Sequence, residues 1–297
     1  MTTDVEQSAR IPDSEYGRLI QLIKGSDSVE LKLTVPAGAH RATIAGLPVD
    51  PVEARPRQVF FFDTPDLALN DAGIVVRARR SQGGKGDTVV KLRPVVPSEL
   101  PTEVRQNPAF NVEVDVLPGG FVCSGSFKGR TSGQDVRDGV SGALPIRKLF
   151  SKEQREFYAA HAPAGIELDS LEVLGPTFVL KARFEYEAVG VVEAGDRLMV
   201  AEMWLYPDGS RILELSTKCD PAIAFQVAAE ARAYLAGLGI PLTGEQQTKT
   251  KTALEFFSAE LAGEQPTGVT TSPVPAAKPA PAARPTEPAP AESTPAS

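Results

Sequence analysis

Cysteine, histidine and excess positive charge are all scarce in this chain of 297 residues. Two cysteines, Cys123 and Cys219, and two histidines, His40 and His161, are too few for a disulfide framework or a zinc cluster. Acidic residues outnumber basic ones by 38 to 31, which argues against general nucleic-acid binding because that requires a basic surface. The sequence has neither an apolar run of about 18 residues nor a basic-then-apolar leader. We therefore expect no membrane span, no secretion and a cytoplasmic location.

By composition the chain divides into an ordered part and a tail. Apolar residues make up 42% of the sequence, enough for a substantial core. From about residue 263 onward proline and alanine dominate, so residues 263–297 are expected to be disordered. The ordered part should comprise an N-terminal segment with a short helix, residues 1–26, and one domain, residues 27–262.

Alternation of apolar and polar residues dominates residues 28–216 and predicts a strand-rich domain. The turn signals between strands are short and favour antiparallel hairpins, hence a large antiparallel sheet or barrel. The candidate strands are 28–35, 57–63, 73–81, 87–94, 110–117, 166–173, 177–190, 197–206 and 211–217. Helical periodicity predicts peripheral helices over 14–24, 151–161 and 221–238.

Three of these strands carry basic residues spaced two apart. The pairs are Arg77 with Arg79, Lys91 with Arg93, and Lys181 with Arg183. Because side chains alternate between the two faces of a strand, both members of each pair point the same way. The opposite face, which we expect to pack against a core, carries Val76, Ala78, Val90, Leu92, Leu180 and Ala182.

Other strands carry carboxylates on their charged face. They are Glu30, next to Lys32 on the same face, Glu113 with Asp115, Glu202 and Glu214. A solvated sheet face explains any single strand, but such faces usually mix both signs, whereas here cations and anions occupy different strands. In a closed barrel these buried charges would need neutralising. A phosphate-rich anion with a divalent metal would neutralise both sets.

The order of these motifs resembles the CYTH, or triphosphate tunnel metalloenzyme, superfamily. The segment Ser28-Val29-Glu30-Leu31-Lys32 is similar to its N-terminal Glu-x-Glu-x-Lys signature. The segment Phe61-Phe62-Asp63-Thr64-Pro65, followed by the Arg77-x-Arg79 strand, resembles another of its motifs. With the later basic and acidic strands and a closing TKTKT segment, the resemblance extends over about residues 27–256.

This resemblance implies an α+β fold in which a closed eight-stranded antiparallel β-barrel with peripheral helices encloses a triphosphate tunnel. It also implies Mg²⁺ or Mn²⁺ as cofactor and a triphosphate-containing small molecule as partner, with no nucleic acid or membrane, in a monomer or homodimer. Glu30 and Lys32 would be catalytic. The implied triphosphate ligands are Lys32, Arg77, Arg79, Lys91, Arg93, Lys181, Arg183 and Lys251. The implied metal ligands are Glu30, Glu113, Asp115, Glu202 and Glu214.

The sequence departs from the family pattern at three positions. Ser28 replaces the first Glu of the signature, and Ser216 follows Glu214 where many members have a second acid. Trp204 follows Glu202 on the same strand face, where it would either pack in the wall or stack on a base. Fewer carboxylates should weaken metal binding and turnover.

Three functions fit these residues. The favoured one is metal-dependent hydrolysis of a triphosphate, with inorganic triphosphate preferred to a nucleotide or thiamine triphosphate. The alternative within the family is a class IV adenylyl cyclase, which converts ATP to cAMP. The alternative outside catalysis is a module that binds polyphosphate or an organophosphate without turnover.

Overall fold

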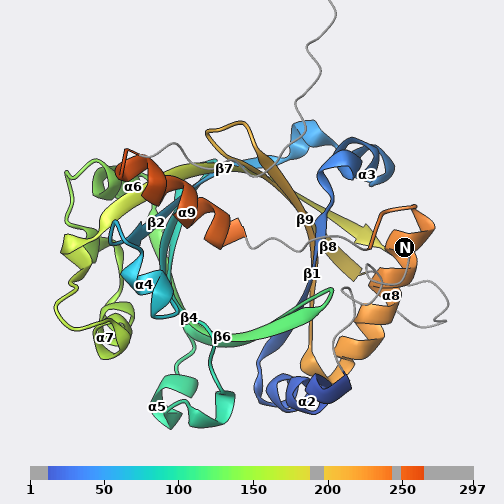
Figure 1. Ribbon diagram of the computed structural model, residues 1–297, viewed down its shortest axis with the longest axis horizontal. Helices are drawn as coiled ribbons and strands as arrows, with labels where there is room; N and C mark the ends of the chain where they lie inside the picture. Colours follow the sequence, from blue (N-terminus) through green and yellow to red (C-terminus); the bar gives the residue numbers. More distant parts are fainter. Residues whose placement is uncertain (1–12, 188–196, 243–248, 264–297) are drawn as a thin grey trace, which may run out of the picture.

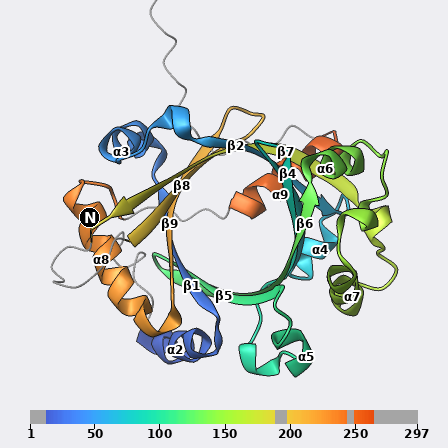
Figure 2. The same ribbon diagram turned by 180° about the vertical axis from the view of Figure 1, so that it is seen from behind.

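Nine strands close into a barrel in this computed structural model, which describes residues 13–187, 197–242 and 249–263 (Figures 1 and 2). Around the barrel the strands follow the order β1-β5-β6-β4-β3-β2-β7-β8-β9. Their bounds are β1 (Ser28–Val35), β2 (Arg55–Asp63), β3 (Ile74–Ser81), β4 (Lys85–Leu92), β5 (Phe110–Leu117), β6 (Gly120–Ser132), β7 (Glu172–Tyr186), β8 (Arg197–Leu205) and β9 (Arg211–Cys219). The predicted closed barrel is confirmed. The predicted disordered tail lies outside the described residues from residue 264 on.

The strand count and one strand direction differ from the expected eight-stranded antiparallel barrel. Strand β6 was not predicted, because its sequence is rich in serine and glycine, which have weak strand propensity. The predicted strands 166–173 and 177–190 instead contribute to one long strand, β7, which begins at Glu172. Strand β1 runs parallel to β5, while its other neighbour, β9, and all remaining pairs are antiparallel.

The turn between β3 and β4 contains a glycine run, Gly83-Gly84-Lys85-Gly86, whose composition resembles that of a phosphate-binding loop. Gly83 and Gly84 have φ values of +81° and +75°, a left-handed conformation that favours glycine. Ser81 pairs with Lys85 across the turn. The run is thus a hairpin connection, and phosphate would have to be held by side chains.

The larger part of the hydrophobic core lies outside the barrel, between its outer face and the helices. The helices are α2 (Tyr16–Gly25), α3 (His40–Gly46), α4 (Ala68–Asp71), α5 (Thr102–Arg105), α6 (Gly133–Val140), α7 (Lys152–His161), α8 (Ala224–Gly237) and α9 (Lys249–Leu261). Val76, Ala78 and Val90 are buried in the core that α2, α6 and α7 help to form, as the alternation predicted. Helix α8 covers β1, β8 and β9 on the other side of the barrel (Figure 1).

One stretch of the outer wall is bare. Leu180, which was predicted to pack against a core, is 39% exposed, and the neighbouring Phe178 is 49% exposed. Both lie on β7, and neither belongs to a core cluster of the described residues. The alternation therefore gave the correct face for Leu180 but not its burial.

A buried carboxylate fixes the turn that follows β2. Asp63 accepts hydrogen bonds from the backbone N–H groups of Thr64 at 2.8 Å, Leu69 at 2.8 Å and Asn70 at 3.0 Å. Charge-assisted bonds of this kind are about twice as strong as neutral ones. This family-like motif therefore has a structural role here, because it connects β2 to α4 and β3.

Helix α9 packs against the inner wall at one end of the barrel. Its Ala253, Leu254 and Phe257 are buried against inner-face side chains that include Phe61 and Trp204. In both views α9 reaches from the rim over part of the barrel opening (Figures 1 and 2). The apolar lining at this end explains why Trp204, only 4% exposed, is a wall residue.

Candidate active site

Beyond the apolar end, the barrel interior is charged. As predicted, the basic residues of the inner face alternate with outward-facing residues. They are Lys32, Arg77, Arg79, Lys91, Arg93, Lys181 and Arg183. Asp115 forms ion pairs with Lys32, Lys91 and Arg93. The charged side chains of β1, β4 and β5 therefore meet at one place in the interior. Strand pairing thus brings together residues that are far apart in the sequence.

Three carboxylates form a compact cluster on β1 and β5. Ligand oxygens of Glu30, Glu113 and Asp115 lie within 4.8 Å of one another. The parallel register explains this, because Glu30 pairs with Asp115 and Ser28 pairs with Glu113. The Ser28 hydroxyl lies 3.4 Å from Glu113 Oε2, so it stands beside the cluster where the family signature has an acid. An all-oxygen set of this charge suits Mg²⁺ or Mn²⁺.

Cations surround Asp115, which is 2% exposed. Its carboxylate lies 2.9 Å from Lys32 Nζ, 2.8 Å from Arg93 Nη2 and 3.9 Å from Lys91 Nζ. Burial would raise the pKa of Asp115, but these cations lower it to about 2. Burial lowers the pKa of Lys91 to about 8, although the negative charge of Asp115 acts in the opposite direction. Burial would also lower the pKa of Lys32, but the negative charges of Asp115 and Glu30 outweigh it and raise that pKa. Asp115 is therefore ionised and able to bind a metal.

Glu202 and Glu214 form a second acidic pair, which two lysines neutralise. Lys249 Nζ lies 2.8 Å from Glu202 Oε2 and 2.6 Å from Glu214 Oε1, and Lys181 Nζ lies 3.1 Å from Glu202 Oε1. Burial would raise the pKa of Glu202, but Lys249 and Lys181 hold it well below its usual value. The structure therefore brings only three of the five predicted metal ligands into one cluster.

The lysine that enters the tunnel from the C-terminal segment is Lys249, not Lys251. The predicted ligand Lys251 is 66% exposed and pairs with Glu255 along α9. Two residues along a helix turn the side chain by about 200°, so Lys249 and Lys251 face opposite sides of α9. The sequence analysis therefore chose the correct segment, but it did not predict that this segment is a helix, and so it chose the wrong lysine.

Several inward cations were missed by the sequence analysis. Arg57 on β2, Lys128 on β6 and Lys218 on β9 share the inner face with the predicted residues, and Lys218 pairs with Glu113. Arg57 lies two residues before Val59, and Lys218 lies two residues after Ser216. Strand alternation alone therefore places both side chains on the inner face. Lys128 was missed because its strand was not predicted.

Arg57 and Arg77 carry positive charge that no carboxylate pairs with among the described residues. The Nε atom of each is buried without a hydrogen-bond partner. Burial, together with the neighbouring Arg79, lowers the pKa of Arg77 to about 9. Arg79 is paired with Asp87 at 2.8 Å. This side of the tunnel therefore favours an anion.

Both histidines contact backbone carbonyls, His40 that of Val35 at 3.0 Å and His161 that of Phe157 at 2.8 Å. These contacts give each ring a structural role. Trp204 donates to Glu202 Oε2 at 3.3 Å, and Lys249 lies 5.0 Å from its ring centroid. The indole therefore supports the second acidic pair.

Neither a protein-family model nor a curated protein sequence matches the chain. Solved structures do. A candidate adenylate cyclase from Bacillus halodurans aligns over 76% of this chain and 96% of its own, with a TM-score of 0.53 and 14% identity. The chain therefore shares the fold of this solved structure. A candidate adenylyl cyclase from Hippeastrum, described as having a dominant triphosphatase activity, aligns over 79% of this chain and 95% of its own, with a TM-score of 0.55 and 16% identity.

These matches confirm the fold that the sequence resemblance implied, a closed barrel with peripheral helices. In the described ranges no helix combines the length and apolar character that crossing a membrane requires.

Proposed function

We propose that the protein hydrolyses a triphosphate, with inorganic triphosphate as the favoured substrate, in a reaction that depends on Mg²⁺ or Mn²⁺. One observation carries the proposal: arginines that no described carboxylate pairs with, and whose Nε atoms are buried, occupy the same barrel interior as a three-carboxylate cluster. The neighbours of the same fold are consistent with it, since one of them is described as a triphosphatase.

Each side of the tunnel has its own task in this proposal. Arg57 and Arg77 would bind phosphate oxygens, because guanidinium groups match them in geometry and charge. Glu30, Glu113 and Asp115 would hold the metal ion, which when bound would polarise the phosphate oxygens. Fixed positive groups that stabilise charge on the transferring phosphoryl group would provide the main catalytic effect.

Glu30 and Lys32 are the residues to which we assign the reacting centre. Lys32 Nζ lies 3.1 Å from Glu30 and 2.9 Å from Asp115, at the border between the acidic cluster and the cations. Metal binding at the carboxylates would release the Lys32 ammonium towards the phosphate. Glu30, 24% exposed, would then orient the attacking water.

The reduced number of available acids favours a second candidate, phosphate binding without turnover. Ser28 adds no carboxylate to the cluster, and Lys249 neutralises Glu202 and Glu214. A tunnel of this kind would still bind triphosphate through Arg57 and Arg77. The two candidates differ in whether Pi is released.

The decisive experiment incubates the protein with inorganic triphosphate, ATP or thiamine triphosphate under Mg²⁺ or Mn²⁺ and measures Pi, PPi and cAMP. Triphosphatase activity should release Pi from inorganic triphosphate, and Arg77→Ala should reduce the rate by about 10²–10³-fold. The matched control is Arg137→Ala, on the exposed surface of α6. Release of cAMP and PPi from ATP would assign the cyclase instead. Thermal stabilisation by triphosphate without any product would assign the binder.

A further inference from the structure

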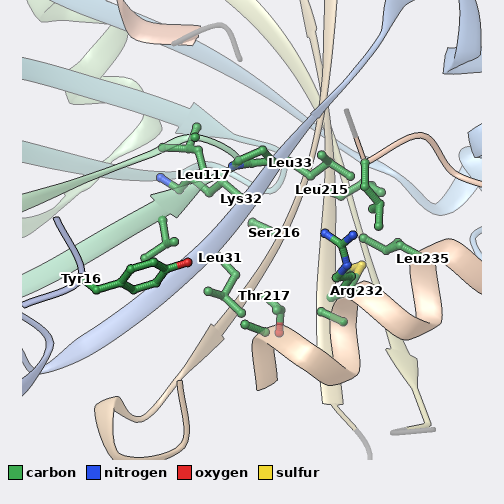
Figure 3. Close-up of a pocket in the computed structure, with 17 residues that line it drawn as sticks. Tyr16, Leu31, Lys32, Leu33, Leu117, Leu215, Ser216, Thr217, Arg232 and Leu235 are labelled. Carbon is green, nitrogen blue, oxygen red and sulfur yellow. The ribbon is translucent and has the colours of Figure 1, made fainter. Parts of the chain in front are cut away.

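A second cavity lies on the outer side of the barrel wall, behind the charged tunnel. Its volume is about 550 Å³. It lies between β1 and β9 on one side and α8 on the other, with Tyr16 of α2 at one edge (Figure 3). Leu31 and Leu33, which flank the tunnel residue Lys32, line it from β1.

The walls of this outer pocket are apolar and well packed. Leu33, Met199, Leu215 and Leu235 line it, and each is at most 6% exposed. The pocket is therefore held in place by side chains that are fixed in the core around α8. Its volume falls in the range of about 300–1,000 Å³ that is typical of small-molecule sites.

Arg232 is the charged group that the pocket offers to a ligand. It projects from α8 towards β1 and β9 (Figure 3), and no ion pair or hydrogen bond of its side chain is found within the described ranges. The other charged lining residue, Lys32, directs its ammonium to Asp115 on the tunnel side. Among the residues that the structure describes, no Asp or Glu lines the pocket. A ligand here would therefore meet an apolar chamber with a single positive charge.

We propose that the outer pocket binds a small amphiphile that carries one carboxylate on an unbranched aliphatic chain. The chain would lie against Leu33, Leu215 and Leu235, and the carboxylate would pair with Arg232. This site is separate from the triphosphate tunnel and does not depend on the activity proposed for it.

Decanoate is the probe for this proposal, measured by isothermal titration calorimetry on the full chain. We expect saturable one-to-one binding of decanoate, tighter than that of 1-decanol and of decyltrimethylammonium. Octanoate should bind about fifteenfold more weakly than decanoate, because each buried methylene tightens binding about fourfold. Arg232→Gln should weaken decanoate binding about fivefold without changing that of 1-decanol. Arg137→Gln, on α6, is the control and should change neither.

A second pair of variants locates the site. Ala228 lines the pocket, whereas the next residue, Ala229, is exposed outside it. Ala228→Trp should abolish decanoate binding, and Ala229→Trp should leave it intact. Should Ala228→Trp fail to fold, the octanoate series and Arg232→Gln still test the proposal.

Three results would overturn the proposal. The first is that decanoate, 1-decanol and decyltrimethylammonium bind equally or not at all. The second is that a folded Ala228→Trp binds decanoate as the unmodified protein does. The third is that Ala228→Trp changes the oligomeric state in sedimentation while decanoate binding is absent from both proteins, which would identify the pocket as an interface between copies.

Discussion

Replacing Lys249 by methionine should destabilise the protein more than any other single charge removal in α9. Lys249 contacts Glu202 and Glu214 at 2.8 and 2.6 Å, and its side chain is only 15% exposed. Removing one partner from a buried ion pair costs about 3–5 kcal/mol, because the remaining charge stays buried. Lys181 still pairs with Glu202, so we expect the lower end, about 3 kcal/mol at pH 7.

Urea unfolding, followed by circular dichroism, measures this cost. The control is Lys251→Met on the same helix, which removes an exposed pair with Glu255 and should cost no more than about 0.5 kcal/mol. Equal effects of the two substitutions would contradict the inward assignment of Lys249. They would also restore Lys251 as a candidate tunnel residue.

The pH dependence of the same variant provides an independent check. Against the effect of burial, Lys249 and Lys181 lower the folded-state pKa of Glu202, so Glu202 contributes stability above its unfolded pKa and loses it as pH falls. The loss begins near the unfolded value of about 4.3 and continues below it. Lys249→Met removes part of this contribution. The stability difference between the two proteins should therefore narrow below about pH 4.3.

Three further substitutions test the cluster, the helix and the turn. Ser28→Glu should tighten Mn²⁺ binding, read by electron paramagnetic resonance, because it adds a carboxylate beside Glu113; unchanged affinity would argue against a metal there. Leu254→Ala should lower the unfolding free energy by about 2–5 kcal/mol, whereas the exposed Leu261→Ala should change it by no more than about 0.5 kcal/mol; similar losses would contradict the packing of α9. Asp63→Ala should cost about 3 kcal/mol in urea unfolding, because three backbone donors lose their acceptor; a neutral result would exclude that role.

The sequence predicted the inward face well because strand alternation is a local property. Lys91 and Arg93 share a face whatever their strand pairs with, and the burial of Val90, the residue before Lys91, confirms the direction. The family resemblance supplied the closure into a barrel, which alternation alone does not determine. How these residues act on a ligand stays a prediction.

What the sequence did not predict depends on contacts between distant residues. Strand β6 is stabilised by pairing with β4 and β5 more than by its own serine- and glycine-rich sequence. The family resemblance implied Glu202 as a metal ligand, but in the structure its charge is balanced by Lys249, which lies 47 residues away on a helix that was not predicted. Pairing partners of this kind are set by tertiary structure.

The packing of α9 couples the position of this helix to the charge balance of the barrel. Ala253, Leu254 and Phe257 are buried against the inner wall, which places Lys249, at the start of the same helix, against Glu202 and Glu214. If α9 moved away from the wall, it would take with it the cation that lies between these two buried carboxylates. Docking of the C-terminal helix and neutralisation of the interior are therefore one event.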